Sequence, residues 1–188
     1  MLSCLKNTVI IVATVLILTG CEKKVVELYA QPHDGIIIAS VKDGKELGER
    51  YQIATVNAIS FSDDLDFNGS EGDVIATADF INGSFTMELP ATVSDEFLKK
   101  FNNKYGKISN QNAKLACVTF FKAYDKEGVH VGYLEYISNK KYWYPAYFWY
   151  TDSDITLTYR SDFSLKRGWN IQYESEEAHN DMKWEFYQ

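Results

Sequence analysis

The pattern of hydrophobic and polar positions predicts strands along most of the chain after residue 35. Short runs of β-branched and aromatic residues recur about every ten residues, between tight polar turns, as is typical of antiparallel β proteins. No regular alternation of helical and strand patterns supports a parallel sheet. We therefore expect an all-β fold, an antiparallel β-sandwich of the Ig-like or prealbumin-like kind, with an antiparallel β-barrel as the alternative. The runs lie at 36–39, 51–61, 73–80, 84–89, 113–124, 129–137, 142–150, 154–160, 163–173 and 182–187.

The strongest local pattern is a turn between two of these runs. Along 73–80 and 84–89, apolar side chains alternate with polar ones, as in strands that bury one face. Asn82-Gly83 stands between the two runs, and this pair supplies the positive φ angles that a type I′ turn needs. The pattern predicts a β-hairpin over 73–89.

A helical pattern occurs near 94–103. Ser94 is placed to cap free backbone amides, and the acidic Glu96 follows in the first turn, where the helix dipole favours it. Phe97 and Phe101 fall on one apolar face. We expect one short helix near 94–103, which covers an end of the β-structure.

The longest uncharged run lies at the start of the chain. It covers residues 8–18 after a single positive side chain, Lys6. As a helix it would be about 17 Å long, well short of the ~30 Å hydrocarbon core of a membrane. A positive start, an apolar middle and a small residue, Gly20, indicate a cleaved signal peptide over residues 1–20. The alternatives are an uncleaved anchor, or an ordinary signal peptide followed by a chance cysteine.

Cys21 directly follows Leu18-Thr19-Gly20, and these four residues resemble the lipobox of bacterial lipoproteins. The resemblance implies that the Cys21 thiol carries a diacylglycerol, that the chain is cut before Cys21, and that the new amino group is acylated. Two or three acyl chains hold a protein on a membrane far more firmly than one chain does. We therefore expect lipidation of Cys21 and a protein anchored to the bacterial cell envelope, in the outer membrane, with its periplasmic or surface orientation left open.

The rest of the chain divides into a tether and one domain. Residues 21–35 are expected to form the lipidated cysteine and a short tether that ends near Pro32 and Gly35, although an apolar group at 25–28 would also suit a first strand. Residues 36–188 are enough for a single β domain.

The chain has a net charge of −7, from 26 acidic and 19 basic side chains. Nucleic acids are bound by clustered basic residues, so we exclude them as partners. Of the three cysteines, Cys4 leaves with the signal peptide and Cys21 carries lipid, so Cys117 has no partner for an internal disulfide. We expect Cys117, on an apolar strand, to be a small core residue rather than a catalytic thiol.

Residues 142–150, Tyr-Trp-Tyr-Pro-Ala-Tyr-Phe-Trp-Tyr, form an unusually aromatic stretch. In a strand, Trp143, Tyr147 and Trp149 project to one face. If exposed, these rings would suit a sugar or a protein partner, because flat aromatic side chains offer a large contact area. The alternative is that both faces of the strand are covered and that Pro145 marks an edge or a bulge.

A short acidic segment bears on metal binding. Asp64, Asp66 and Asn68, followed by Gly69, match the opening of a calcium loop, but Ile75 stands where the bidentate glutamate belongs. These three residues are a weak calcium candidate, with a solvated acidic loop as the alternative. The three histidines are far apart and lack the spacing of a zinc site. We expect no metal and no cofactor.

Three segments carry a further resemblance. They are 82–90 (NGSFTMELP), 150–158 (YTDSDITLT) and 165–170 (LKRGWN), and they are similar to segments of small lipoproteins from Bacteroidota-type bacteria. The resemblance would cover residues 36–188. It implies a β-sandwich-like secreted domain, and it brings no catalytic residues with it.

Two functions from different classes fit these patterns. The sequence holds no nucleophile elbow, phosphate-binding loop or dinucleotide fingerprint, so we expect that the protein is not an enzyme. The first function is a noncatalytic binding module on the envelope, which recognises a glycan or another extracellular ligand through exposed aromatic residues. The alternative is a structural or assembly subunit that binds another envelope protein.

Overall fold

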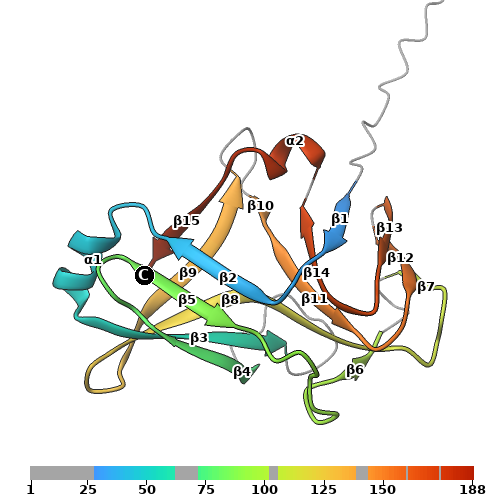
Figure 1. Cartoon of the computed structure of the whole chain (residues 1–188), viewed down its shortest axis with the longest axis horizontal. Coiled ribbons are helices and arrows are strands. Elements are labelled where there is room, and N and C mark those ends of the chain that lie inside the picture. The colour runs from blue at the N-terminus through green and yellow to red at the C-terminus, as the bar shows by residue number, and fades with distance from the viewer. Residues whose placement is uncertain (1–27, 62–71, 102–105, 139–143, 160, 174) are drawn as a thin grey trace, which may run out of the picture.

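The computed structural model describes residues 28–61, 72–101, 106–138, 144–159, 161–173 and 175–188 (Figure 1). Within these ranges the chain forms strands and two short helices, α1 (Gly44–Tyr51) and α2 (Glu176–His179). The strands are β1 (Tyr29–Pro32), β2 (Ile36–Ser40), β3 (Ile53–Phe61), β4 (Gly72–Asp79), β5 (Ser84–Glu88), β6 (Lys99–Lys100), β7 (Lys107–Ile108), β8 (Lys114–Asp125), β9 (His130–Ser138), β10 (Tyr144–Pro145), β11 (Tyr147–Thr151), β12 (Ile155–Tyr159), β13 (Ser161–Leu165), β14 (Gly168–Tyr173) and β15 (Met182–Tyr187).

A large antiparallel sheet is built around β8. Its main path has the order β1-β14-β11-β8-β3-β4, and β9 branches from β8 to carry β10 and β15. The two arms splay apart because β9 pairs with 121–124 of β8, whereas β11 pairs with 115–118 (Figure 1). The expected all-β, antiparallel sandwich is confirmed, and in the described part of the chain the sheets stay open rather than closing into a barrel.

Two smaller sheets cover opposite faces of the large one. The β2–β5 pair lies over one face, and β13-β12-β7 lies over the other. Along β8 the side chains alternate between the two cores: Ala116 and Val118 face the first, and Leu115 and Cys117 face the second. At β8 and β11 the molecule is therefore three layers thick.

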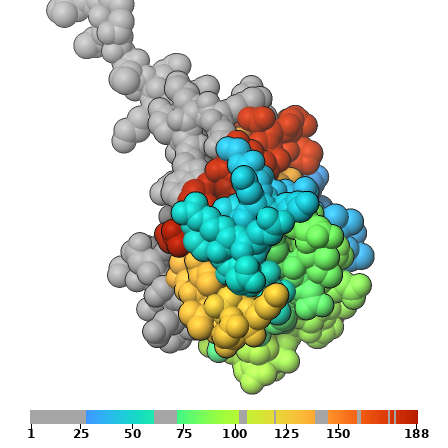
Figure 2. Space-filling view, turned by 90° about the vertical axis from the view of Figure 1, so that its left-hand side faces the viewer, coloured from blue at the N-terminus to red at the C-terminus, as the bar shows by residue number. Residues whose placement is uncertain are grey.

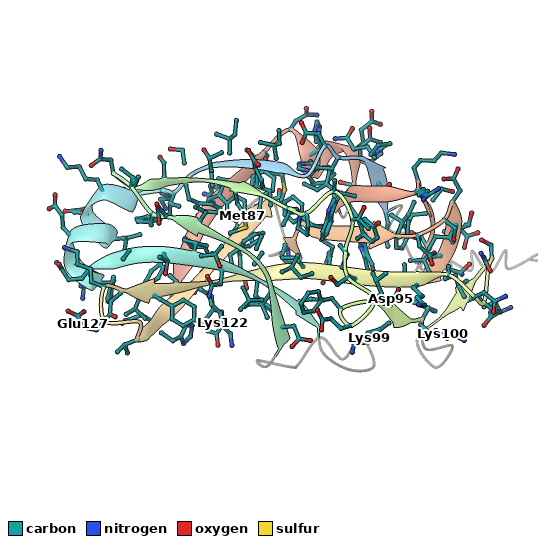
Figure 3. The ribbon with its side chains drawn as sticks, turned by 60° about the horizontal axis from the view of Figure 1, so that its bottom comes forward. Met87, Asp95, Lys99, Lys100, Lys122 and Glu127 are labelled. Atoms are coloured by element: carbon teal, nitrogen blue, oxygen red, sulfur yellow. The ribbon has the colours of Figure 1, made fainter. Side chains whose placement is uncertain are left out.

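The first core lies between the large sheet and the β2–β5 layer, and Phe121 is at its centre. This side chain is fully buried, with ring centroids 4.9 Å from Trp184, 5.8 Å from Phe148 and 6.1 Å from Phe85. Met87 of β5 reaches down between the layers (Figure 3). Truncating a buried phenylalanine typically costs about 3–5 kcal/mol, so these aromatic contacts are a main source of stability.

The turn at Asn82-Gly83 forms as expected, but its two strands part at once. Asn82 and Gly83 have φ angles of 51° and 84°, and a bridge between Ile81 and Ser84 closes the turn. Beyond it, β4 pairs with β3, whereas β5 pairs with β2 in the other layer. The predicted hairpin over 73–89 is therefore wrong as a paired unit, because the turn connects two sheets.

The helix expected near 94–103 is not formed. Hydrogen bonds from Phe97 N to Ser94 O (3.0 Å) and from Leu98 N to Asp95 O (3.3 Å) make a single turn. The chain then pairs with the edge of β8 as β6, where Lys99 and Lys100 lie near the end of β8 (Figure 3). The half-buried Phe97 and Leu98 pack on the first core, so burial of these side chains outweighs the local helical pattern.

Other boundaries differ from those expected. The stretch 163–173 is two strands, β13 and β14, joined by a tight turn that Asn170 organises through its side-chain bonds to Lys166 N and O. β1 lies within the residues expected to be tether. Tyr29 pairs with Tyr173, so the folded domain begins before residue 36. The described helices include none that is long and apolar enough to cross a membrane.

The edge strands of the large sheet differ in length and in how far other residues cover them. β1 has only four residues and ends at Pro32, a residue that discourages further pairing. The outer edge of β15 is partly covered, because Val41 pairs with Trp184 and Lys42 N donates to Trp184 O (3.0 Å). β4 has eight residues and, within the described residues, pairs with β3 alone.

Candidate functional site

The first candidate surface is the aromatic stretch at 142–150. Trp143 lies outside the described residues, and Tyr147 is half-buried. Trp149 is only 4% exposed, because the β13-β12-β7 sheet covers that face of β11. Its indole Nε1 donates to Gln172 Oε1 (3.1 Å), which satisfies both groups in the second core. Of the two alternatives for this strand, coverage of both faces therefore holds at Trp149.

The other sequence candidates fall in several places. Cys21 and the calcium candidates Asp64, Asp66 and Asn68 lie outside the described residues. Cys117 is buried in the second core, which confirms its expected place. In the described part of the chain, no three potential metal ligands come together.

Aromatic rings that are partly or fully exposed gather on the outer face of the large sheet, on the side away from β2–β5. Tyr124 is near the end of β8, and His130 and Tyr133 are on β9. They point outward because their neighbours Phe121, Ala123 and Leu134 alternate with them into the first core. We call Tyr124, His130 and Tyr133 the tyrosine face.

The three rings form a continuous group. The centroid of His130 lies 5.6 Å from that of Tyr124 and 4.6 Å from that of Tyr133, and the latter pair meets edge to face at 71°. The imidazole is exposed and both tyrosines are half-buried, so ring surface and polar tips reach solvent together. Edge-to-face contacts of this kind hold the rings in defined orientations.

A row of polar side chains crosses the sheet beside these rings. The pairings Thr77–Asn57, Asn57–Lys122 and Lys122–Tyr133 place one residue each from β4, β3, β8 and β9 on the same face. Thr77 Oγ1 donates to Asn57 Oδ1 (2.8 Å), which fixes the amide. Figure 3 shows Lys122 on the side of the sheet away from Met87. Hydroxyl, amide and ammonium groups therefore border the tyrosine face.

Next to Tyr133 on the same face of β9 lies Glu135, which is 8% exposed. Burial raises the pKa of its carboxyl group to about 7. The pKa of its cross-strand neighbour Glu185 is shifted in the opposite direction. A hydrogen bond from Tyr187 (2.7 Å), and then one from Lys183 (2.9 Å), lower the pKa of Glu185. The two neighbouring carboxyl groups at this end of the face therefore have pKa values shifted in opposite directions.

A depression lies at the end of the molecule formed by α1. Figure 2 shows α1 between the β8–β9 hairpin and the β4–β5 region. A depression of about 570 Å³ lies between α1 and the turn at Asn82, and its side chains include Asp43, Lys45, Glu46 and Glu49. These charged groups are exposed, and no aromatic ring lines the depression. It is a weaker candidate for recognition than the tyrosine face.

Comparison with known proteins adds no family assignment: no family model, curated protein or solved structure matches the chain significantly.

The sequence does contain a signal for the tyrosine face. In 120–124, Phe-Phe-Lys-Ala-Tyr, and in 130–137 the outward positions carry Lys122, Tyr124, Tyr133 and Glu135, between buried residues. Strand alternation alone places these side chains on one side. It does not distinguish a covered face from an open one, and the richer aromatic content of 142–150 directed attention to the covered strand.

Proposed function

We propose that this protein is a membrane-anchored, noncatalytic binding module of the bacterial envelope, and that its tyrosine face binds a glycan. The observation that carries the proposal is the contact of three solvent-reaching rings on one face of the sheet, next to a row of hydroxyl, amide and ammonium groups. Sugar rings offer an apolar face for stacking and hydroxyl groups for hydrogen bonds, so both parts of the surface have a counterpart in the ligand.

The roles of the residues follow from their chemistry. Tyr124 and Tyr133 provide stacking surface, and His130 between them adds an imidazole that donates or accepts a hydrogen bond. Asn57, held by Thr77, presents its amide donors to sugar hydroxyls. No residue is assigned to bond cleavage, and the lipid on Cys21 is proposed to keep the module at the membrane.

Titration of the processed protein with a panel of soluble neutral and acidic oligosaccharides tests this function. We expect at least one to bind, and Tyr124→Ala with Tyr133→Ala to weaken binding at least about tenfold, which corresponds to ~1.4 kcal/mol. Tyr133→Phe keeps the stacking surface and should retain most of the affinity.

Tyr29→Ala is the matched control, because Tyr29 is also half-buried but lies on β1 at the far end of the sheet. It should leave affinity unchanged. Binding by the double variant equal to that of the wild type, or no binding to any oligosaccharide in the panel, would contradict the proposal.

The outer edge of β4, which has no partner strand among the described residues, favours a second function, assembly with an envelope protein. β4 lacks the lysine or proline that commonly protects an edge, and Val74 is 45% exposed there. A partner could add a strand to this edge. In that case Val74→Lys would abolish copurification of one envelope protein and leave oligosaccharide titrations unchanged. Glycan binding that depends on the two tyrosines, with no copurifying protein, would favour the first function.

A further inference from the structure

The outer surface of the β2–β5 layer carries exposed isoleucines. Ile36, Ile38 and Ile81 are 46%, 78% and 63% exposed, and they are three of the five large hydrophobic side chains exposed in the described residues. Along β2 the inward positions, Ile37 and Ala39, are buried, so strand alternation puts isoleucine where a polar residue would normally face water.

The strand register places these side chains on one surface. Ile36 lies opposite Glu88, and Ile38 lies opposite Thr86. Ser84 is paired with both Ser40 and Ile81, so the third isoleucine continues the same side of the layer. We call Ile36, Ile38 and Ile81 the isoleucine face. Hydroxyl groups lie between its members.

The size of this face argues against a protein partner. Three isoleucines offer on the order of 300 Å² of apolar surface, whereas a stable protein interface needs about 800 Å² from each side. Its chemistry suits the boundary of a lipid bilayer, where small apolar side chains insert and hydroxyl groups stay among the headgroups. The acidic groups nearby are Glu88 on β5 and Asp34, whose Oδ1 accepts from Ile36 N (2.8 Å). Neutral lipids should therefore be preferred to anionic ones.

The path of the chain keeps this face near the proposed lipid. Seven residues, 21–27, precede the described part of the chain, and they span at most about 24 Å. The tether ends at Leu28, whose backbone N–H donates to Ser161 Oγ (2.9 Å) beside β13, and from there β1 and the short link 33–35 lead to β2 (Figure 1). For a protein already held by acyl chains, weak insertion becomes an intramolecular event with a high effective concentration.

We propose that the isoleucine face rests in the headgroup region of the membrane that holds the lipid on Cys21. This inference rests on the anchor in the proposed function. Because the β2–β5 layer and the tyrosine face lie on opposite sides of the first core, the tyrosine face then points away from the membrane. The lipid fixes where the protein is, and the three isoleucines fix which side it presents.

The test uses the processed full chain, reconstituted into neutral phosphatidylcholine vesicles. An environment-sensitive NBD label is placed at Ile38→Cys, or at Thr77→Cys on the opposite side of the sandwich. Cys117 is 1% exposed, and the unsubstituted protein measures its background labelling. A quencher carried on the lipid should reduce the fluorescence of label 38 several-fold and leave label 77 nearly unchanged.

Further variants separate insertion from chance proximity. In the label 38 background, Ile36→Ser with Ile81→Ser should abolish most of the quenching. Val129→Ser is the matched control, since Val129 is 58% exposed in the β8–β9 turn, and it should have no effect. An unquenched label 38 on vesicle-bound protein, or stronger quenching of label 77, would overturn the proposal.

Flotation with the vesicles separately tests whether Cys21 carries the proposed lipid. Protein without acyl chains does not float with the vesicles. In that case the same labelled variants are held on nickel-chelating phosphatidylcholine vesicles by a hexahistidine tag placed before residue 22. If label 38 is quenched on these vesicles, the isoleucine face inserts without the lipid on Cys21. If label 38 is not quenched, the proposed insertion of the isoleucine face is contradicted.

Discussion

Glu135 places a carboxyl group on β9 where little water reaches it. Because burial raises its pKa from 4.5 to about 7, the folded protein binds a proton more tightly than the unfolded chain does. Its contribution to stability is therefore present at pH 4.5 and below, and it is lost as the pH rises through 7. The loss is at most about 3 kcal/mol, and partial solvation of the carboxyl group reduces it.

Glu135→Gln should remove this dependence. Thermal unfolding between pH 5 and pH 8.5 is the measurement. The wild type should lose several degrees of Tm as the pH rises, and the variant should lose less and be the more stable protein at pH 8.5. Glu127→Gln, at an exposed turn residue, is the control. An equal slope for Glu135→Gln and wild type would show that Glu135 is not the titrating group.

Single residues were predictable where the pattern around them was simple. Cys117 is buried, as its apolar strand indicated. Trp149 points away from the first core, as alternation requires, yet it is buried because a second sheet covers it. That sheet, β13-β12-β7, is formed by residues that no local pattern links to Trp149. Exposure of a strand face depends on such distant segments.

At the scale of elements, the position of α1 depends on Gly44 at its start and on Gly83 in the β4–β5 turn. The α1 sequence has two apolar side chains, Leu47 and Tyr51, and two glycines, so its pattern is weak. The helix is held against the β4–β5 turn. A Cβ atom on Gly83 would lie 2.5 Å from Lys45 N, and one on Gly44 would lie 2.5 Å from Gly83 O. Only glycine allows the turn and the start of α1 to approach this closely.

Gly83→Ala should destabilise the protein twice over. It forces alanine into a left-handed conformation at φ 84° and pushes a methyl group into α1. Gly128→Ala is the matched control, because Gly128 has φ 79° and no neighbour within 4 Å. The control should cost about 1 kcal/mol, and Gly83→Ala at least about 2 kcal/mol, in urea unfolding. Equal costs would show that the close approach adds nothing.

Local sequence therefore fixed most of the strands and the conformation of the Asn82-Gly83 turn, but not the partners of the strands. The alternation in β4 and β5 is that of a hairpin, and Ala78 of β4 is buried like Phe85 and Met87 of β5. They diverge because β5 packs over Phe121, where burial of Phe85 and Met87 completes the first core. The single turn at 94–97 has the same cause, since its apolar side chains are used for packing on that core. Pairing and packing over long distances decided these outcomes.

For the whole molecule, the two cores share β8 and β11. Phe121 lies in the first core and Leu157 in the second, and both are fully buried. Because the same two strands supply side chains to both, neither core can open without disturbing the other. We expect one cooperative unfolding transition.

This can be checked with Cys4→Ser and Cys21→Ser in place, so that Cys117 is the only thiol. Labelling of Cys117 reports the second core, and the fluorescence of Trp169 and Trp184 contributes a signal from the first. Phe121→Ala and Leu157→Ala should each lower the urea midpoint of both signals by the same amount. The expected loss of unfolding free energy is about 2–5 kcal/mol for each variant. Separate midpoints would show that the cores unfold independently.

The pairing of the first strands with the last has a consequence for how the chain is made. β1 pairs with β14, and Val41 pairs with Trp184. These early segments therefore have no pairing partner until synthesis is nearly complete. Chains with such distant contacts fold slowly. The large sheet therefore cannot be completed until the last strands have been synthesised. A chain that stops before β14 lacks the strand that pairs with both β1 and β11.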